Sequence, residues 1–158
     1  MRILLAVDES EHSRRVVRYV GSLLRGVSDV ALTLFHVLRP MPRELLEHGG
    51  SENPAVEAQL SLQLRDEQAA WIRKEAEAEC HILKRACETL TQSGFDTSRV
   101  LLKYGHEDDI AGNILEEARV GRHETIVVGR HGASRGFGGR VTDQLLREAT
   151  GFALWVVE

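Results

Sequence analysis

Five short apolar runs alternate with amphipathic patterns along this chain of 158 residues, and this alternation constrains the fold more than any other feature. The runs cover residues 3–7, 30–38, 100–104, 126–128 and 152–157. Nearly continuous apolar character is typical of strands that are covered on both faces, as in parallel sheets. The order β-α-β-α-β-α-β-α-β therefore predicts one α/β domain over residues 1–158. We expect a five-stranded parallel sheet with helices on both faces and right-handed crossovers.

Two segments between the runs stand out. Residues 55–91 carry one long helical pattern, and its length leaves room for a break near Asp66. The segment that begins at Arg39 and ends at Pro54 contains all three prolines of the chain. Such a composition is typical of an irregular excursion, either a lid over a ligand site or a disordered connection.

Composition and charge exclude several classes of protein. The net charge of −4 is small, so nothing global points to nucleic acid or to an anionic membrane as a partner. The first residues show no signal-peptide pattern, and no apolar run is long enough to span a membrane. Cys80 and Cys87 fall two turns apart on one helix, too far for a disulfide, which favours reduced thiols in the cytoplasm.

The fourth apolar run leads into a glycine-rich turn and then into an amphipathic helix. The turn and helix start contain Gly129, Gly132, Gly136, Gly138 and Gly139, with Arg130, Arg135 and Arg140 among them. Such a turn lets the backbone approach a phosphate closely, and the N–H groups at the helix start point toward it. The alternative is a flexible loop that is merely rich in glycine.

A second polar stretch follows the first strand. If that strand is central in the sheet, the strand order reverses beside it, and Asp8 comes to lie beside Gly129. Asp8 is either a ligand of a hydroxyl or of a Mg²⁺-bound water, or a helix cap, a role that Ser10 can also take. His131 lies inside the glycine turn, where it either contacts ribose or phosphate or simply fills the loop.

Other well-known sites are absent from the sequence. No lysine follows the glycines as in a P-loop, and no glycine follows the first strand as in dinucleotide-binding domains. The phosphoacceptor aspartate of receiver domains and the G-x-S-x-G nucleophile turn are missing as well. The histidines show no metal-ligand spacing, so we interpret His12, His36 and His106 as separate surface or cap residues. Trp71 and Trp155 are interpreted as core or interface anchors.

Four segments of the chain resemble the universal stress protein family in their order and spacing. They are ILLAVDESEHSRR, LTLFHVLRP, YGHEDDIAGNILEEARVGRHETIVVGRHG and GFALWVV. The resemblance covers nearly the whole chain and implies an adenine nucleotide alpha hydrolase-like sheet with strand order 3-2-1-4-5. It also implies a cytoplasmic stress-response protein that dimerises through its last strand, here from Phe152 to Val157. Many members of the family bind ATP and others do not.

The family's phosphate motif is kept only in its first half. That motif is a glycine, two residues, a second glycine, nine residues, and a glycine followed by Ser or Thr. Gly129 and Gly132 match its beginning, but Gly139 follows after six residues, and Arg140 stands where the hydroxyl residue belongs. An alignment that instead keeps nine residues after Gly132 places Thr142 where the motif has its third glycine. The nucleotide-binding residues implied by the resemblance are Ala6, Val7, Asp8, Val37, Val128, Gly129, His131, Gly132, Gly139, Arg140, Val141 and Thr142.

Two functions remain open at this point. One is a stress-response regulator that binds ATP, AMP or another adenine nucleotide, with Mg²⁺ only as part of the bound nucleotide. The other is a dimeric interaction module with an unidentified protein partner, in which Arg140 fills the shortened phosphate loop. Because no general base is paired with a nucleophile, we expect no catalytic residues, although slow ATP hydrolysis is not excluded.

Overall fold

The computed structural model describes residues 1–38, 45, 52–105, 109–130 and 138–158, and within them it confirms the predicted alternation. The elements are β1 (Arg2–Ala6), α1 (Glu11–Leu23), β2 (Ala31–Val37), α2 (Pro54–Gln92), the short 3₁₀ helix η2 (Thr97–Arg99), β3 (Val100–Gly105), α3 (Ile110–Val120), β4 (Thr125–Gly129), α4 (Gly138–Glu148) and β5 (Ala153–Val157).

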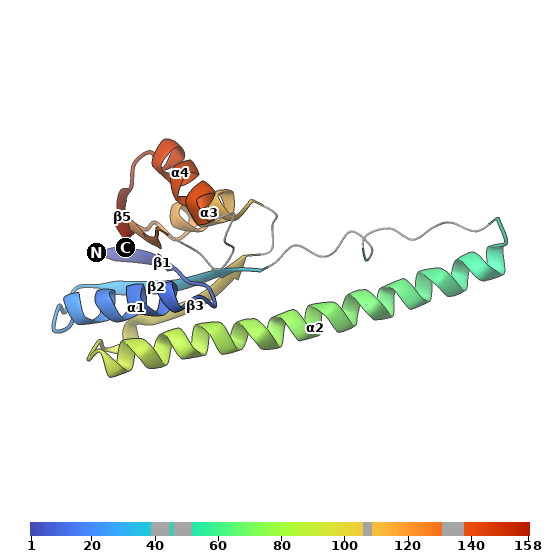
Figure 1. Ribbon diagram of the computed structural model, residues 1–158, viewed down its shortest axis with the longest axis horizontal. Helices are drawn as coiled ribbons and strands as arrows, with labels where there is room; N and C mark the ends of the chain where they lie inside the picture. Colours follow the sequence, from blue (N-terminus) through green and yellow to red (C-terminus); the bar gives the residue numbers. More distant parts are fainter. Residues whose placement is uncertain (39–44, 46–51, 106–108, 131–137) are drawn as a thin grey trace.

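The five strands form one parallel sheet in the order β3-β2-β1-β4-β5, as expected. β1 lies at the centre, where Leu5 is level with Leu34 of β2 on one side and with Val127 of β4 on the other. Helices α1 and α2 cover one face, and α3 and α4 cover the other (Figure 1).

Each face of the sheet has its own hydrophobic core, and alternate residues along the central strands point into one core or the other. Ile3 and Leu5 face α1 and α2, whereas Leu4 faces α3 and α4, and all three side chains are fully buried. Burial on both faces explains why the run of residues 3–7 is apolar throughout.

The prediction of a break near Asp66 is wrong, because α2 is one continuous helix from Pro54 to Gln92. Its residues after Pro54 include no glycine or proline, and a single exposed aspartate costs a helix only a fraction of a kcal/mol. Asn53 caps the helix through the N–H of Ala55, and Gly94 follows the end with a φ of 84°. The half of α2 nearer its C-terminus packs on α1 and the sheet, and the other half extends beyond them (Figure 1).

The excursion of residues 39–54 falls largely outside the described residues, so neither its lid nor its linker interpretation is tested. Within the described part of the chain, no helix is long and apolar enough to cross a membrane. Cys80 and Cys87 are free thiols on α2, and partial burial, assisted by the charge of Glu88, raises the pKa of Cys87.

Candidate functional site

The carboxyl ends of β1, β2 and β4 lie next to one another along one edge of the sheet, and the helices that follow β1 and β4 pack on opposite faces. From β1 the chain enters α1 on one face, and from β4 it continues to α4 on the other. Because β1 lies between β2 and β4, this edge is the switch point at which α/β sheets bind ligands. The expected central position of the first strand is thus confirmed.

An apolar ledge lies at this edge, on the face covered by α3 and α4. Ala6, Val37 and Val128 come from three neighbouring strands and belong to the same core cluster, which Val141 of α4 joins. Val128 is buried, whereas Ala6, Val37 and Val141 are only partly buried. The fold therefore brings four of the predicted site residues together, with three of them partly open to solvent.

Val7 and Asp8, which follow β1, are not part of the apolar ledge. The Val7 side chain packs into the opposite core, so its backbone rather than its side chain borders the edge. Its carbonyl accepts a hydrogen bond from Nδ1 of buried His36 at 2.7 Å. The interpretation of His36 as a surface or cap residue is therefore wrong.

Asp8 shapes the turn between β1 and α1. Its Oδ1 accepts a hydrogen bond from the Ser10 N–H at 2.9 Å, and its own N–H donates to Ser13 Oγ at 3.0 Å. Ser10 is the N-cap of α1, because its hydroxyl oxygen accepts from the Ser13 N–H at 3.0 Å. Of the two expected capping residues, Ser10 takes the role and Asp8 holds the preceding turn.

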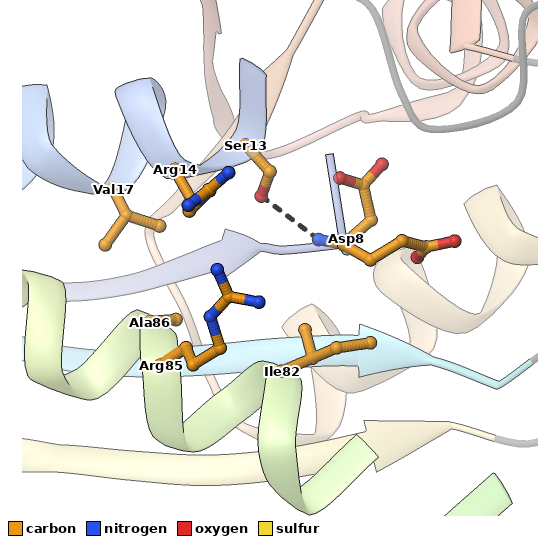
Figure 2. A pocket seen from close by; sticks show the side chains of 8 residues that line it. Asp8, Ser13, Arg14, Val17, Ile82, Arg85 and Ala86 are labelled. Atoms are coloured by element: carbon orange, nitrogen blue, oxygen red, sulfur yellow. Dashed lines mark hydrogen bonds between the residues drawn. The ribbon is translucent and has the colours of Figure 1, made fainter. Parts of the chain in front are cut away.

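A small hollow of about 30 Å³ lies beside Asp8, between α1 and α2 (Figure 2). It is lined by Asp8, Glu9, Ser13, Arg14, Val17, Ile82, Arg85 and Ala86. It lies on the face of the sheet opposite the apolar ledge. A ligand of nucleotide size needs a few hundred Å³, so this hollow suits a water molecule at most.

A hydrogen bond ties the start of α4 to the end of β4. The hydroxyl of buried Thr142 donates to the Gly129 carbonyl at 3.2 Å. Gly139 and Arg140 lie in the first turn of α4, where backbone N–H groups have no partner within the helix. His131 and Gly132, and the side chain of Arg140, lie outside the described residues.

His12 packs directly against Gly129, a contact that the sequence did not reveal. A Cβ on Gly129 would lie 2.7 Å from Cδ2 of His12. The His12 Nε2 is 3.1 Å from the Val157 carbonyl of β5, and Nδ1 is 3.3 Å from the Arg15 guanidinium. Since a carbonyl only accepts, Nε2 carries the proton there. His12 is thus a buried link between α1, β4 and β5, not the surface or cap residue that we expected.

Arg130, expected to add charge to the phosphate loop, is held at the end of β5. Its guanidinium forms an ion pair with the Glu158 carboxylate, and its N–H donates to the Val157 carbonyl at 2.9 Å. Both side chains are exposed, so the pair contributes little to stability. It does direct the guanidinium toward the chain terminus.

The N-cap of α3 is joined to the middle of α4 by residues that were not among the predicted site residues. Asp109 caps α3 through the Gly112 N–H at 3.0 Å, and Gln144 of α4 donates to its carboxylate at 3.3 Å. Asn113 lies over Gly105, where a Cβ would be 2.3 Å from its Oδ1. The D-x-x-G spacing after β3 was the available signal for this cap.

The fit of a nucleotide rests on this arrangement. The ledge offers partly open apolar surface for a base, and the N-terminus of α4 offers backbone N–H groups for phosphate. Among the described residues, no three His, Cys, Asp or Glu side chains are grouped to hold a metal ion on their own.

A doubly wound parallel sheet with Gly129 and the start of α4 at its switch point defines the class to which this chain belongs. Within that class, the chain belongs to the universal stress protein family, which matches residues 1–156. A comparison with curated protein sequences finds no match.

Solved structures support the fold. UspA from Lactobacillus plantarum is similar with a TM-score of 0.67 at 15% identity, covering 100% of this chain and 97% of that one. The universal stress protein from Archaeoglobus fulgidus in complex with dAMP gives 0.60 at 17%, covering 100% and 98%. A family member from Arabidopsis thaliana with AMP bound gives 0.59 at 17%, covering 99% and 90%. Identities this low show the shared fold alone.

Proposed function

We propose that this universal stress protein binds an adenine nucleotide at the ends of β1, β2 and β4. The adenine ring lies on the ledge of Ala6 and Val37, and the ribose and phosphates follow Gly129 toward the start of α4. The observation that carries this proposal is that the ledge and the α4 N-terminus meet at one edge, tied by the Thr142–Gly129 hydrogen bond. Relatives of the same fold with dAMP and AMP bound support it.

The remaining residues of the proposed site contribute polar contacts. Val7 offers backbone groups beside the base, and Asp8 accepts from a ribose hydroxyl or a water of Mg²⁺ carried by the nucleotide. Gly132, Gly139 and the backbone of Val141 belong to the phosphate side, with His131 beside the ribose. Arg140 replaces the neutral hydroxyl of the family motif with a charge-assisted phosphate contact.

We further propose that the protein acts by binding rather than by catalysis, as a cytoplasmic stress-response regulator. Its partner is a second copy that pairs along β5. This strand is the edge of the sheet, and Val156 on it is 39% exposed. An apolar edge strand of this kind is usually covered in soluble proteins.

The proposal is tested by titration calorimetry with ATP, ADP, AMP and cyclic AMP, each with and without Mg²⁺. We expect the wild-type protein to bind and Arg140→Ser to bind at least tenfold more weakly, about the loss of one charge-assisted contact. The matched control is Arg147→Ser, because Arg147 lies exposed in the last turn of α4 and should leave affinity unchanged.

The second candidate function is an interaction module without nucleotide, and the loop shortened by three residues before Gly139 favours it. If this alternative holds, the wild-type protein binds no nucleotide and the Arg140→Ser variant does bind it, because Arg140 fills the pocket inherited from the family. If neither protein binds at millimolar nucleotide, the binding proposal is overturned.

A further inference from the structure

A regular apolar seam runs along the half of α2 that extends beyond the sheet. We call it the α2 seam; its residues are Ala55, Ala58, Leu62, Arg65, Ala69, Ile72 and Ala76. They alternate at spacings of three and four, the repeat by which two helices pack along each other. The same spacing, with Glu79 at the one position between Ala76 and Leu83, leads on to Leu83, Ala86 and Leu90, which are buried against α1 and the sheet.

The α2 seam itself has no such cover. All seven of its residues are exposed, with Leu62 at 62% and Ile72 at 52%. None of the labelled helices or strands lies beside this half of α2 (Figure 1). This half of α2 is about 34 Å long and has no neighbouring helix or strand among the described residues, although most helical stability in proteins comes from packing an apolar face.

Leu45, a described residue of the excursion, contacts a different side of α2. Leu64, Gln68 and Trp71 are only partly exposed, and the Gln68 side-chain amide donates to the Leu45 carbonyl. None of these residues belongs to the α2 seam. The occupant of the α2 seam therefore has to come from outside the described chain.

We propose that the α2 seam pairs with the α2 seam of a second copy of this chain, in antiparallel orientation. In the matching register, Leu62 packs against the partner's Ile72, Ala58 against the partner's Ala76, and Arg65 against the partner's Ala69. A parallel pair would bring the two Arg65 side chains together inside the seam. The antiparallel pair instead lets each arginine stem lie over a small alanine with its charge in water.

Charge complementarity supports the same register. Asp66 and Arg73 flank the α2 seam on one side, and neither has an ion-pair partner among the residues that the structure describes. In the antiparallel register, Asp66 and Arg73 of both copies lie on the same side of the pair. The partner's Arg73 is about 8 Å along the axis from Asp66, within reach of an arginine side chain, and two-fold symmetry repeats this pair. Flanking charges of this kind set the orientation of paired helices.

Sedimentation equilibrium tests the association. We expect Leu62→Glu/Ile72→Glu to weaken self-association at least tenfold and to lower the mean mass. The control Gln63→Glu/Ala70→Glu adds the same charge on the far side of α2 and should keep the wild-type mass. Circular dichroism of both variants reports whether the sheet domain is folded. Equal masses for the two folded variants would overturn the proposal.

Disulfide trapping tests the orientation without disturbing the α2 seam. In a Cys80→Ser/Cys87→Ala background, the double variant Ala58→Cys/Ala76→Cys should form a covalent dimer on oxidation. Within one chain these positions are about 27 Å apart, beyond the reach of a disulfide. Each single variant should stay monomeric on a denaturing gel. A covalent dimer of Ala58→Cys alone would indicate parallel packing, and no product from the double variant would contradict pairing; either result overturns the proposal.

A charge exchange gives an independent check. Asp66→Arg alone or Arg73→Asp alone should weaken the association, because each places like charges side by side twice. The double variant Asp66→Arg/Arg73→Asp should restore it. Failure of the double variant to recover the wild-type mass would contradict the register.

Discussion

At the scale of single residues, Gly129 meets two requirements at once. Its carbonyl accepts from Thr142 at the start of α4, and the His12 ring occupies the space where a side chain would begin. From the sequence, Gly129 was expected only to contact the ribose and phosphate of a nucleotide. The packing requirement was hidden, because His12 belongs to another element and meets Gly129 only in the folded sheet.

Gly129→Ala should destabilise the protein by about 1–3 kcal/mol, because the new methyl group forces the His12 ring away from the Val157 carbonyl. Urea unfolding measures the change. The control is a double-mutant cycle with His12→Ala, which removes the ring: Gly129→Ala should cost much less in that background. If the two substitutions lower the free energy of unfolding additively, the His12 ring does not restrict the side chain at position 129.

Residues whose partners are local were predictable, and those with distant partners were not. Ser10 was predicted as a capping residue, and Asp8 as either a cap or a ligand, because a cap bonds to N–H groups two or three positions away. The roles of Asn113 and Thr142 depend on contacts between different elements. No pattern along the chain encodes such contacts.

At the scale of elements, the strands were predictable because burial on both faces leaves a continuous apolar run. The continuity of α2 was not predictable, because its length exceeds that of most helices in globular proteins. One part packs on α1 and the sheet, and the rest extends beyond them. The length of the helical pattern alone therefore suggested a break.

The connection between α3 and β4 contains a buried titratable group. His123 is 5% exposed; its Nε2 lies 2.8 Å from Thr33 Oγ1, and its Nδ1 has no hydrogen-bond partner within the described chain. Burial lowers the pKa of His123, and Arg2 adds to this, whereas Glu117, ion-paired with Lys103, opposes it. The neutral imidazole is thus the form that the fold favours.

The stability contributed by neutral His123 should be present above about pH 6.5, the pKa of an unfolded histidine, and lost as the pH falls below it. Below that pH, His123 takes up a proton in the unfolded chain more readily than in the folded protein. Unfolding free energies from pH 7.5 to 5 should therefore fall less steeply for His123→Gln than for the wild-type protein. His81→Gln, at an exposed position of α2, should keep the wild-type slope. Parallel profiles for His123→Gln and wild type would refute the prediction.

At the scale of the whole molecule, β5 leaves one side of the sheet open. Leu154, Trp155 and Val157 are partly buried against the two cores, while the outer backbone edge of the strand has no neighbouring strand in the described chain. The proposed pairing of two β5 strands would join their sheets. The proposed pairing through α2 would join copies at a different place, so both together would link more than two chains.

Val156→Lys should weaken pairing through β5 at least tenfold, because a lysine on an edge strand opposes strand addition. The measurement is sedimentation at micromolar concentration in the Leu62→Glu/Ile72→Glu background, where pairing through α2 does not mask the result. Val156→Thr keeps the β-branched shape and should remain dimeric. A monomeric parent in this background would contradict the β5 dimer itself.

The hydrogen bond between Thr142 and Gly129 has a consequence for how this protein can change over evolution. It fixes both ends of the connection between β4 and α4, so insertions and deletions there need not disturb the sheet. Restoring three residues to this connection would alter its closure entropy by only about 0.3 kcal/mol. Ligand preference can therefore diverge by loop length while the scaffold stays constant, which makes this connection a natural place for one fold to acquire different specificities.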